Sequence, residues 1–123
     1  MFRSNNRHMS NSAIYIRFIN LSHAIFGQLE HVGIDLLALR LLEAIAIAHS
    51  EGTALTVTDA MALNAIASPA TMHRKLTNLL DARLIEQVFE GKNRRTKYLV
   101  PTSQASKYFE QLGKALVLAN QLP

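Results

Sequence analysis

The stretch 68–102 constrains the fold of this chain more than any other part of its sequence. It opens with Ser68 and Pro69; serine is a good helix N-cap, and proline suits the first position of a helix. Apolar residues at helical spacing continue to about Arg83 and leave a polar face on the other side. The opening of this stretch therefore predicts an amphipathic helix over 68–83.

A predicted β-hairpin follows this helix at once. Strand-forming residues occupy 84–90 and 96–100, and the turn-forming residues of 91–93 separate them. Thr102 or Ser103 is then expected to cap a final helix. A basic helix followed directly by a basic hairpin is the sequence outline of a winged helix-turn-helix.

The rest of the chain is typical of helices. Apolar residues recur at three- and four-residue steps over 12–30 and 102–120, and 35–49 is rich in Leu, Ala and Ile. A short strand is expected at 53–55 and a short helix at 56–63. The predicted fold class is therefore mainly α with a small β-hairpin.

The positive charge of the chain is concentrated in one segment. The formal net charge is +4. Between His73 and Lys97 there are seven lysines and arginines against three acids, and seven minus three is again +4. A basic excess confined to one segment is the footprint of a face that binds a polyanion, although an ordinary solvated surface is the alternative.

Both parts of this segment suit duplex DNA. The major groove admits one α-helix, and arginine can contact guanine through two hydrogen bonds. The hairpin tip carries three cations in four residues, which a phosphate backbone or a narrow minor groove would stabilise. The alternative is that the helix has an ordinary solvated face and that a tip arginine pairs with Glu90 or Asp81. The expected DNA-contacting residues are Ser68, Thr71, His73, Arg74, Lys75, Asn78, Lys92, Arg94, Arg95 and Lys97.

Residues from about 34 to 116 resemble the MarR family of bacterial winged-helix regulators. The similarity lies in the element order, the SPATMHRKL helix, the LLDARLIEQ passage, the NRR tip and the PTSQ start of the last helix. Asn93 stands where the family usually has an acid, and Arg83 where it usually has glycine. The resemblance implies a sequence-specific regulator of transcription that binds double-stranded DNA, and it allows a small aromatic or lipophilic effector.

The outer helices carry more apolar surface than one neighbouring helix needs. Burying one Leu, Ile or Phe is worth roughly 1.5–3 kcal/mol, so exposing several would be costly. We expect N- and C-terminal dimerisation helices over 12–30 and 102–120, as the family resemblance also implies; the alternative is that they pack on each other in a monomer. The expected dimerisation residues are Ile14, Phe18, Leu21, Ile25, Tyr108, Leu112 and Leu116.

The length of 123 residues fits a single winged-helix domain over 12–123, with 1–11 as a frayed or disordered lead-in and 53–101 as the DNA-binding lobe. There is no cysteine, and the five histidines lack metal-ligand spacing. We expect no metal, no cofactor, no enzyme activity and no membrane segment, with a cytoplasmic, nucleoid-associated location. Two alternatives to a homodimeric regulator stay open: a winged-helix protein-interaction module (an adaptor or antirepressor), and a plasmid or phage replication-type DNA-binding protein.

Overall fold

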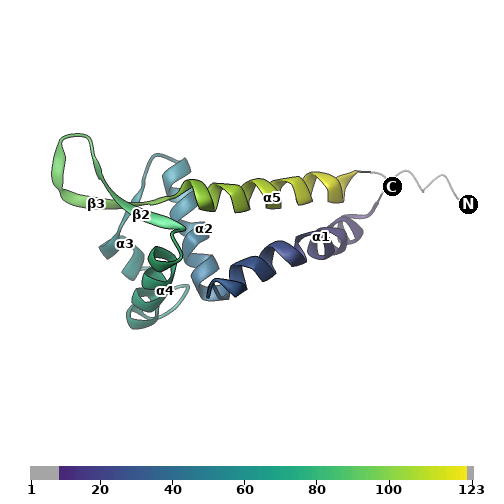
Figure 1. Ribbon diagram of the computed structural model, residues 1–123, viewed down its shortest axis with the longest axis horizontal. Helices are drawn as coiled ribbons and strands as arrows, with labels where there is room; N and C mark the ends of the chain where they lie inside the picture. The colour runs from purple at the N-terminus through teal and green to yellow at the C-terminus, as the bar shows by residue number, and fades with distance from the viewer. Residues whose placement is uncertain (1–8, 122–123) are drawn as a thin grey trace, which may run out of the picture.

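The computed structural model describes residues 9–121, which form helices and one small sheet (Figure 1). The mainly α fold class with a β-hairpin is confirmed. The elements follow the order α1 (Asn11–His31), α2 (Leu36–Ser50), β1 (Leu55–Thr56), α3 (Val57–Met61), α4 (Pro69–Asp81), β2 (Ile85–Glu90), β3 (Asn93–Pro101) and α5 (Ser103–Asn120).

The first two helices begin at capping side chains. Ser10 accepts a hydrogen bond from the backbone N–H of Ala13 (3.1 Å), so α1 begins at Asn11, one residue earlier than predicted. The predicted lead-in 1–11 otherwise falls mostly on residues 1–8, which lie outside the described part of the chain. Asp35 caps α2 in the same way, through Ala38 (2.9 Å).

Helix α2 is the centre of the hydrophobic core. Leu41, Leu42 and Ile45 are completely buried. Helix α4 and strand β3 both contact α2, so the predicted helix-turn-helix and the hairpin rest on one buried helix. On α4, the apolar stripe predicted from the sequence faces inward; its buried residues are Met72, Leu76 and Leu79.

The helix-turn-helix is bounded by two further caps. Thr56 and Asp59 form a reciprocal capping box at the start of α3, which ends at Met61 and is therefore shorter than predicted. Ser68 caps α4 through the backbone N–H of Thr71, and Pro69 takes the first helical position as expected.

The sheet is antiparallel with the strand order β1-β3-β2. We call the β2–β3 hairpin the wing. Strand β3 begins at Asn93 rather than at residue 96, because Glu90 pairs with Asn93 and only two residues remain in the turn. The short strand predicted at 53–55 forms at Leu55–Thr56 instead, because only these two residues find partners on β3.

Arg83, which stands where the MarR family usually has glycine, adopts a backbone conformation that favours glycine. Its φ is 59°, the left-handed region, which costs a non-glycine residue about 1–2 kcal/mol. The hydroxyl of Thr102 donates to the Arg83 carbonyl (2.7 Å) and accepts from the N–H of Ala105, where it caps α5. Thr102, rather than Ser103, thus joins the start of α5 to the passage between α4 and the wing.

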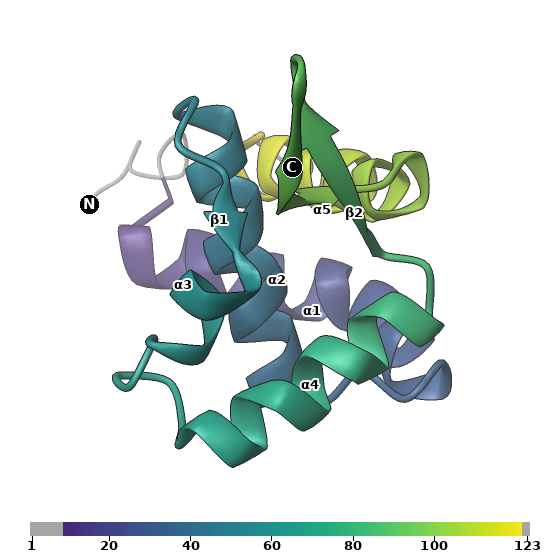
Figure 2. The same ribbon diagram turned by 90° about the vertical axis from the view of Figure 1, so that its left-hand side faces the viewer.

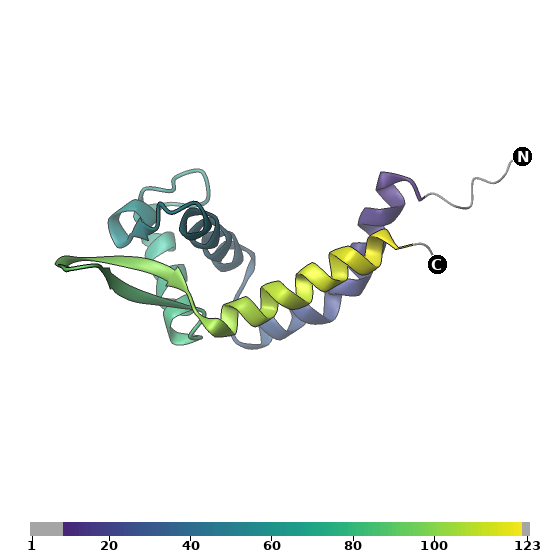
Figure 3. The same cartoon turned by 90° about the horizontal axis from the view of Figure 1, so that it is seen from above.

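Helices α1 and α5 lie side by side and extend away from the rest of the molecule (Figures 1 and 3). Small residues are buried on both helices, namely Ser22 on α1 and Ala115 and Ala119 on α5. Ile25 is only 8% exposed, so its predicted role as a dimerisation residue is corrected: it belongs to the interior of the single chain.

Candidate nucleic-acid interface

Two candidate DNA-binding elements lie at the same end of the molecule, α4 and the wing. Figure 2 looks at this end and shows α4 at the bottom and the wing rising at the top. The free ends of α1 and α5 point the other way (Figure 1). Helix α4 and the wing are therefore both presented to one side.

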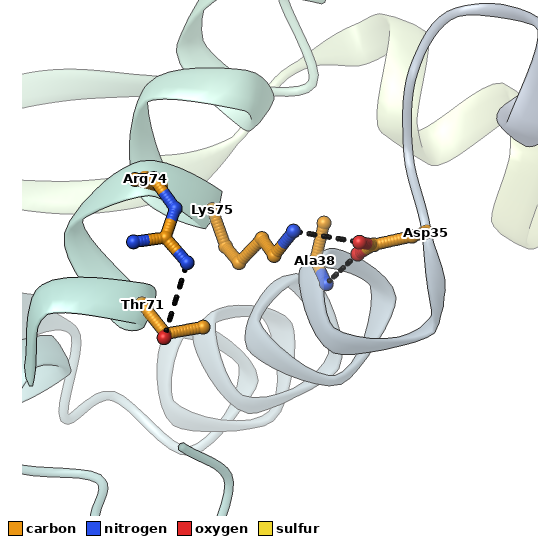
Figure 4. Close-up of polar contacts among 5 residues, drawn as sticks. All are labelled: Asp35, Ala38, Thr71, Arg74 and Lys75. Carbon is orange, nitrogen blue, oxygen red and sulfur yellow. Dashed lines mark hydrogen bonds and ion pairs between the residues drawn. The ribbon is translucent and has the colours of Figure 1, made fainter. Parts of the chain in front are cut away.

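The start of α4 carries a connected set of polar side chains. The guanidinium of Arg74 donates to the hydroxyl of Thr71 (3.3 Å), as Figure 4 shows. Ser68 also donates to that hydroxyl (3.2 Å). Arg74, Ser68 and His73 are exposed, whereas Thr71 and Asn78 are partly covered. The expected reading face of this helix is thus accessible, with Arg74 folded back along the first turn.

Lys75 has a different environment from the other expected contact residues. Its ammonium lies 2.6 Å from a carboxylate oxygen of Asp35, and its side chain is only 15% exposed (Figure 4). Asp35 is also the N-cap of α2, so the ion pair ties α4 to the start of the buried helix. This contact gives Lys75 an anchoring role in the protein itself, which the sequence pattern did not indicate.

The electrostatics of Asp35 reflect this contact. The hydrogen bond from Lys75 holds the pKa of Asp35 below its ordinary value of 3.8, and the backbone N–H of Ala38 lowers it further. The carboxylate is therefore charged throughout the neutral range. Its side chain is 53% exposed, so solvent screens the pair and limits its contribution to stability.

The cations of the wing have no such partner. Lys92, Arg94, Arg95 and Lys97 are exposed. Within residues 9–121 the ion pairs are Lys75–Asp35 and Arg40–Glu43, and the wing cations form none. The alternative pairing of a tip arginine with Glu90 or Asp81 is thus not formed in this part of the chain.

Asn93 replaces the acid of the family pattern and keeps a structural role at the tip. Its side-chain oxygen accepts a hydrogen bond from the backbone N–H of Arg95 (2.9 Å). An amide oxygen can accept this bond as a carboxylate would, while leaving the tip more positive. The turn itself contains Gly91 with a φ of 57°.

A groove that the sequence did not predict lies between the wing and the start of α3, with a volume of about 410 Å³. Thr58 lines it from α3, and Phe89 and Arg95 line it from the wing. Phe89 stands two residues before the turn in the sequence, but only the strand register places it next to Lys97.

The expected dimerisation residues other than Ile25 differ in exposure. Leu116 is 56% exposed, Leu21 is 37% exposed, and Ile14, Phe18, Tyr108 and Leu112 are partly covered. Other residues of the outer helices are more exposed than most of these and were not predicted; they are Tyr15, Ile16, Val117 and Leu118. Single-helix periodicity could not find them, because it does not indicate which side of α1 receives α5.

A crevice of about 580 Å³ lies between α1 and α2. Aromatic rings line it from α1, namely Tyr15, Phe18 and Phe26. Arg40 from α2 also lines it and pairs with Glu43 (3.6 Å). Its lining is therefore mainly apolar, with a few charged groups.

Within residues 9–121, no three histidine or acidic side chains cluster in a way that could hold a metal ion. None of the helices in that range has the length and apolar character needed to cross a membrane.

The architecture is shared with known structures. No protein-family model matches the sequence, and no curated protein sequence matches it significantly. A DNA complex of MepR from S. aureus is 22% identical, with a TM-score of 0.58, over 87% of this chain and 86% of that one. A point mutant of MepR bound to an oligodeoxyribonucleotide is 25% identical, with a TM-score of 0.54, over 94% and 86%. NadR with 4-hydroxyphenylacetate is 20% identical, with a TM-score of 0.50, over 94% and 78%.

The fold is that of the MarR-family winged-helix regulators. The order of elements agrees with the resemblance seen in the sequence, including the positions of the wing and the two outer helices. Arg83 and Asn93, the two departures from the family pattern, preserve this fold through a left-handed backbone and a side-chain-to-backbone hydrogen bond.

The anchoring contact of Lys75 makes a testable prediction. Replacing Asp35→Asn keeps a good N-cap but removes the ion pair, so it should lower the free energy of unfolding at neutral pH by about 0.5–1 kcal/mol. Because the pKa of Asp35 is lowered in the folded state, its contribution is present above the unfolded-state value near 3.8. The contribution is lost as the pH falls through the lower folded-state pKa.

Urea unfolding of the parent and of Asp35→Asn, measured from about pH 7 to about pH 2, checks how the free energy of unfolding depends on pH. The difference between them should close at the acid end. Glu43→Gln is the matched control, because it breaks an exposed pair on the same helix and should change stability little. A constant difference between parent and Asp35→Asn at every pH would contradict the assignment.

Proposed function

We propose that this chain is a DNA-binding regulator of transcription that places α4 in the major groove and the wing against the backbone or minor groove. The observation that carries the proposal is the exposed, unpaired set of wing cations at the same end of the molecule as the polar face of α4. The two MepR structures named above support it, because they are DNA complexes of proteins with this fold.

The proposed contacts divide between two surfaces. Arg74, with Ser68 and Thr71, would contact base edges or phosphates from the start of α4, and His73 and Asn78 would contact the groove walls. Lys92, Arg94, Arg95 and Lys97 would bind phosphates. Lys75 is proposed to contribute by holding α4 in place, since its ammonium is already paired with Asp35.

Salt dependence of DNA binding tests the wing. Each phosphate contact adds about 0.9 to the slope of log affinity against log salt, so Arg94→Ala/Arg95→Ala should lower the slope by up to about 2 units and weaken binding. Lys107→Ala removes an exposed cation from α5 and is the charge control, with a much smaller expected effect.

Fluorescence anisotropy with a labelled duplex over a salt series gives both slopes. A parent protein that does not bind DNA even at low salt, or a double variant that binds like the parent, would contradict the proposal. That result would favour the alternative of a winged-helix module that binds another protein. A replication-type protein would also bind DNA in this assay. The DNA sequence that it selects would distinguish it from a regulator of transcription.

We also propose that the protein acts as a homodimer through the outer ends of α1 and α5. Apolar side chains remain exposed there in the single chain: Tyr15 and Ile16 are each 62% exposed, and Val117 is 60% exposed. Covering them with a second copy would remove this apolar area from water. A two-fold dimer would present two α4 helices to successive turns of DNA, roughly 34 Å apart.

Sedimentation velocity tests the dimer. The parent should sediment with twice the mass of one chain, whereas Ile16→Lys and Val117→Lys should shift it toward the monomer, because a buried lysine would lack a partner. Gln111→Lys adds the same charge to an exposed polar position of α5 and should leave the dimer intact. A monomeric parent at concentrations where it binds DNA would contradict the proposal.

The crevice between α1 and α2 is our candidate site for a small aromatic or lipophilic effector, because three aromatic rings line it. NadR, a protein of the same fold, binds 4-hydroxyphenylacetate. Adding that compound to the anisotropy assay is the first test; an unchanged DNA affinity at saturating compound would count against it as an effector.

A further inference from the structure

Phe89 is an exposed aromatic residue among the cations of the wing. It lies on β2 and is 37% exposed, although a phenylalanine on a strand is usually covered. Its Cα partner on β3 is Lys97, and the strand register shifts immediately after it. The residue therefore sits where the regular part of the hairpin ends and the charged tip begins.

Two cations of the wing lie over this ring. The guanidinium carbon of Arg94 is 5.4 Å from the ring centroid, and the ammonium of Lys97 is 5.7 Å from it. Both distances fall within the range of about 6 Å in which a cation is attracted to an aromatic face. The two side chains come from opposite ends of a four-residue segment and are gathered at one point by Phe89.

The same residues line the groove beside α3. Phe89, Arg94 and Lys97 share its wall with Arg95, and Thr56 and Thr58 line it from the other side. None of the described residues that line this groove carries a carboxylate. Three cations with two hydroxyl-bearing residues opposite them suit an anion of the size of a phosphodiester.

We propose that Phe89 is a positioning residue that holds Arg94 and Lys97 at the groove beside α3, where they bind adjacent phosphates of duplex DNA. The proposal rests on the proposed DNA-binding function and names the residue that organises the wing. A guanidinium over a ring can keep its N–H groups free for an acceptor, and an ammonium over a ring keeps the N–H groups that do not face the ring. The contacts therefore persist when phosphate binds.

The physical effect is a reduction in the entropy lost on binding. Arginine and lysine have many rotamers, and fixing them on a phosphate is costly when they move freely beforehand. The ring of Phe89 restricts both side chains in the free protein. A leucine of similar apolar character has no π face and cannot restrict them in this way.

Three variants distinguish positioning of Arg94 and Lys97 by Phe89 from a direct contact of Phe89 with DNA. Phe89→Leu removes the ring and should weaken binding to a duplex by about three- to tenfold at fixed salt. Phe89→Tyr keeps the ring and should bind within about twofold of the parent. In an Arg94→Ala/Lys97→Ala background, Phe89→Leu should have no further effect, because the groups that it positions are gone.

A measurement on the free protein tests the contact without DNA. Protons that lie over an aromatic face resonate upfield, so the side-chain methylene signals of Arg94 and Lys97 should be upfield in the parent and in Phe89→Tyr. They should return to ordinary positions in Phe89→Leu. Unshifted signals in the folded parent would overturn the proposal, and this test does not depend on how stable any variant is.

The DNA measurements give distinct outcomes. If Arg94→Ala/Lys97→Ala weakens binding but Phe89→Leu does not, Phe89 has no positioning role and the proposed function still stands. If Phe89→Leu weakens binding equally with and without the two cations, Phe89 contacts DNA directly and the proposal is overturned. If Arg94→Ala/Lys97→Ala binds like the parent, the phosphate-binding role of the wing itself fails.

Discussion

The burial of α2 is the constraint on which the rest of the structure depends. Leu41, Leu42 and Ile45 are fully enclosed, and both α4 and β3 pack against this helix. A tightly packed core allows little displacement of the elements around it. The separation between α4 and the wing is therefore set by their common support on α2, as the proposed joint contact with one duplex requires.

Two polar contacts connect the ends of helices to neighbouring elements. The Asp35–Lys75 pair connects α4 to the start of α2, and Thr102 connects the start of α5 to the Arg83 carbonyl. The cations of the wing differ from Lys75, because none of them forms an ion pair with an acid in the described residues. One lysine of the basic segment thus supports the structure, while the cations at the tip stay exposed and without an acidic partner in the described residues.

The sequence could predict the features that depend on local rules. Ser68 and Pro69 marked the start of α4, and the turn formers at 91–93 marked the hairpin, because caps and turns need particular residues at particular places. The partner of Lys75 could not be predicted in this way, because Asp35 is 40 positions away in the chain.

The placement of individual residues on the outer helices was beyond the sequence for a related reason. Periodicity identified an apolar stripe on α1 but could not say that Ile25 faces the interior while Ile16 stays exposed, since that depends on where α5 packs. The contacts of Phe89 also required the register between β2 and β3. Arg83 was recognised as unusual only through the family pattern, and the structure gives its backbone conformation.

The most direct test of the account is to map the DNA contacts on the isotopically labelled protein by NMR, with amide shifts followed as a duplex is added. The largest shift changes should fall on 68–78 and on 91–97 together, with little change on the outward faces of α1 and α5. Changes on only one of these two segments, or largest changes on α1 or α5, would contradict the claim that α4 and the wing bind one duplex together.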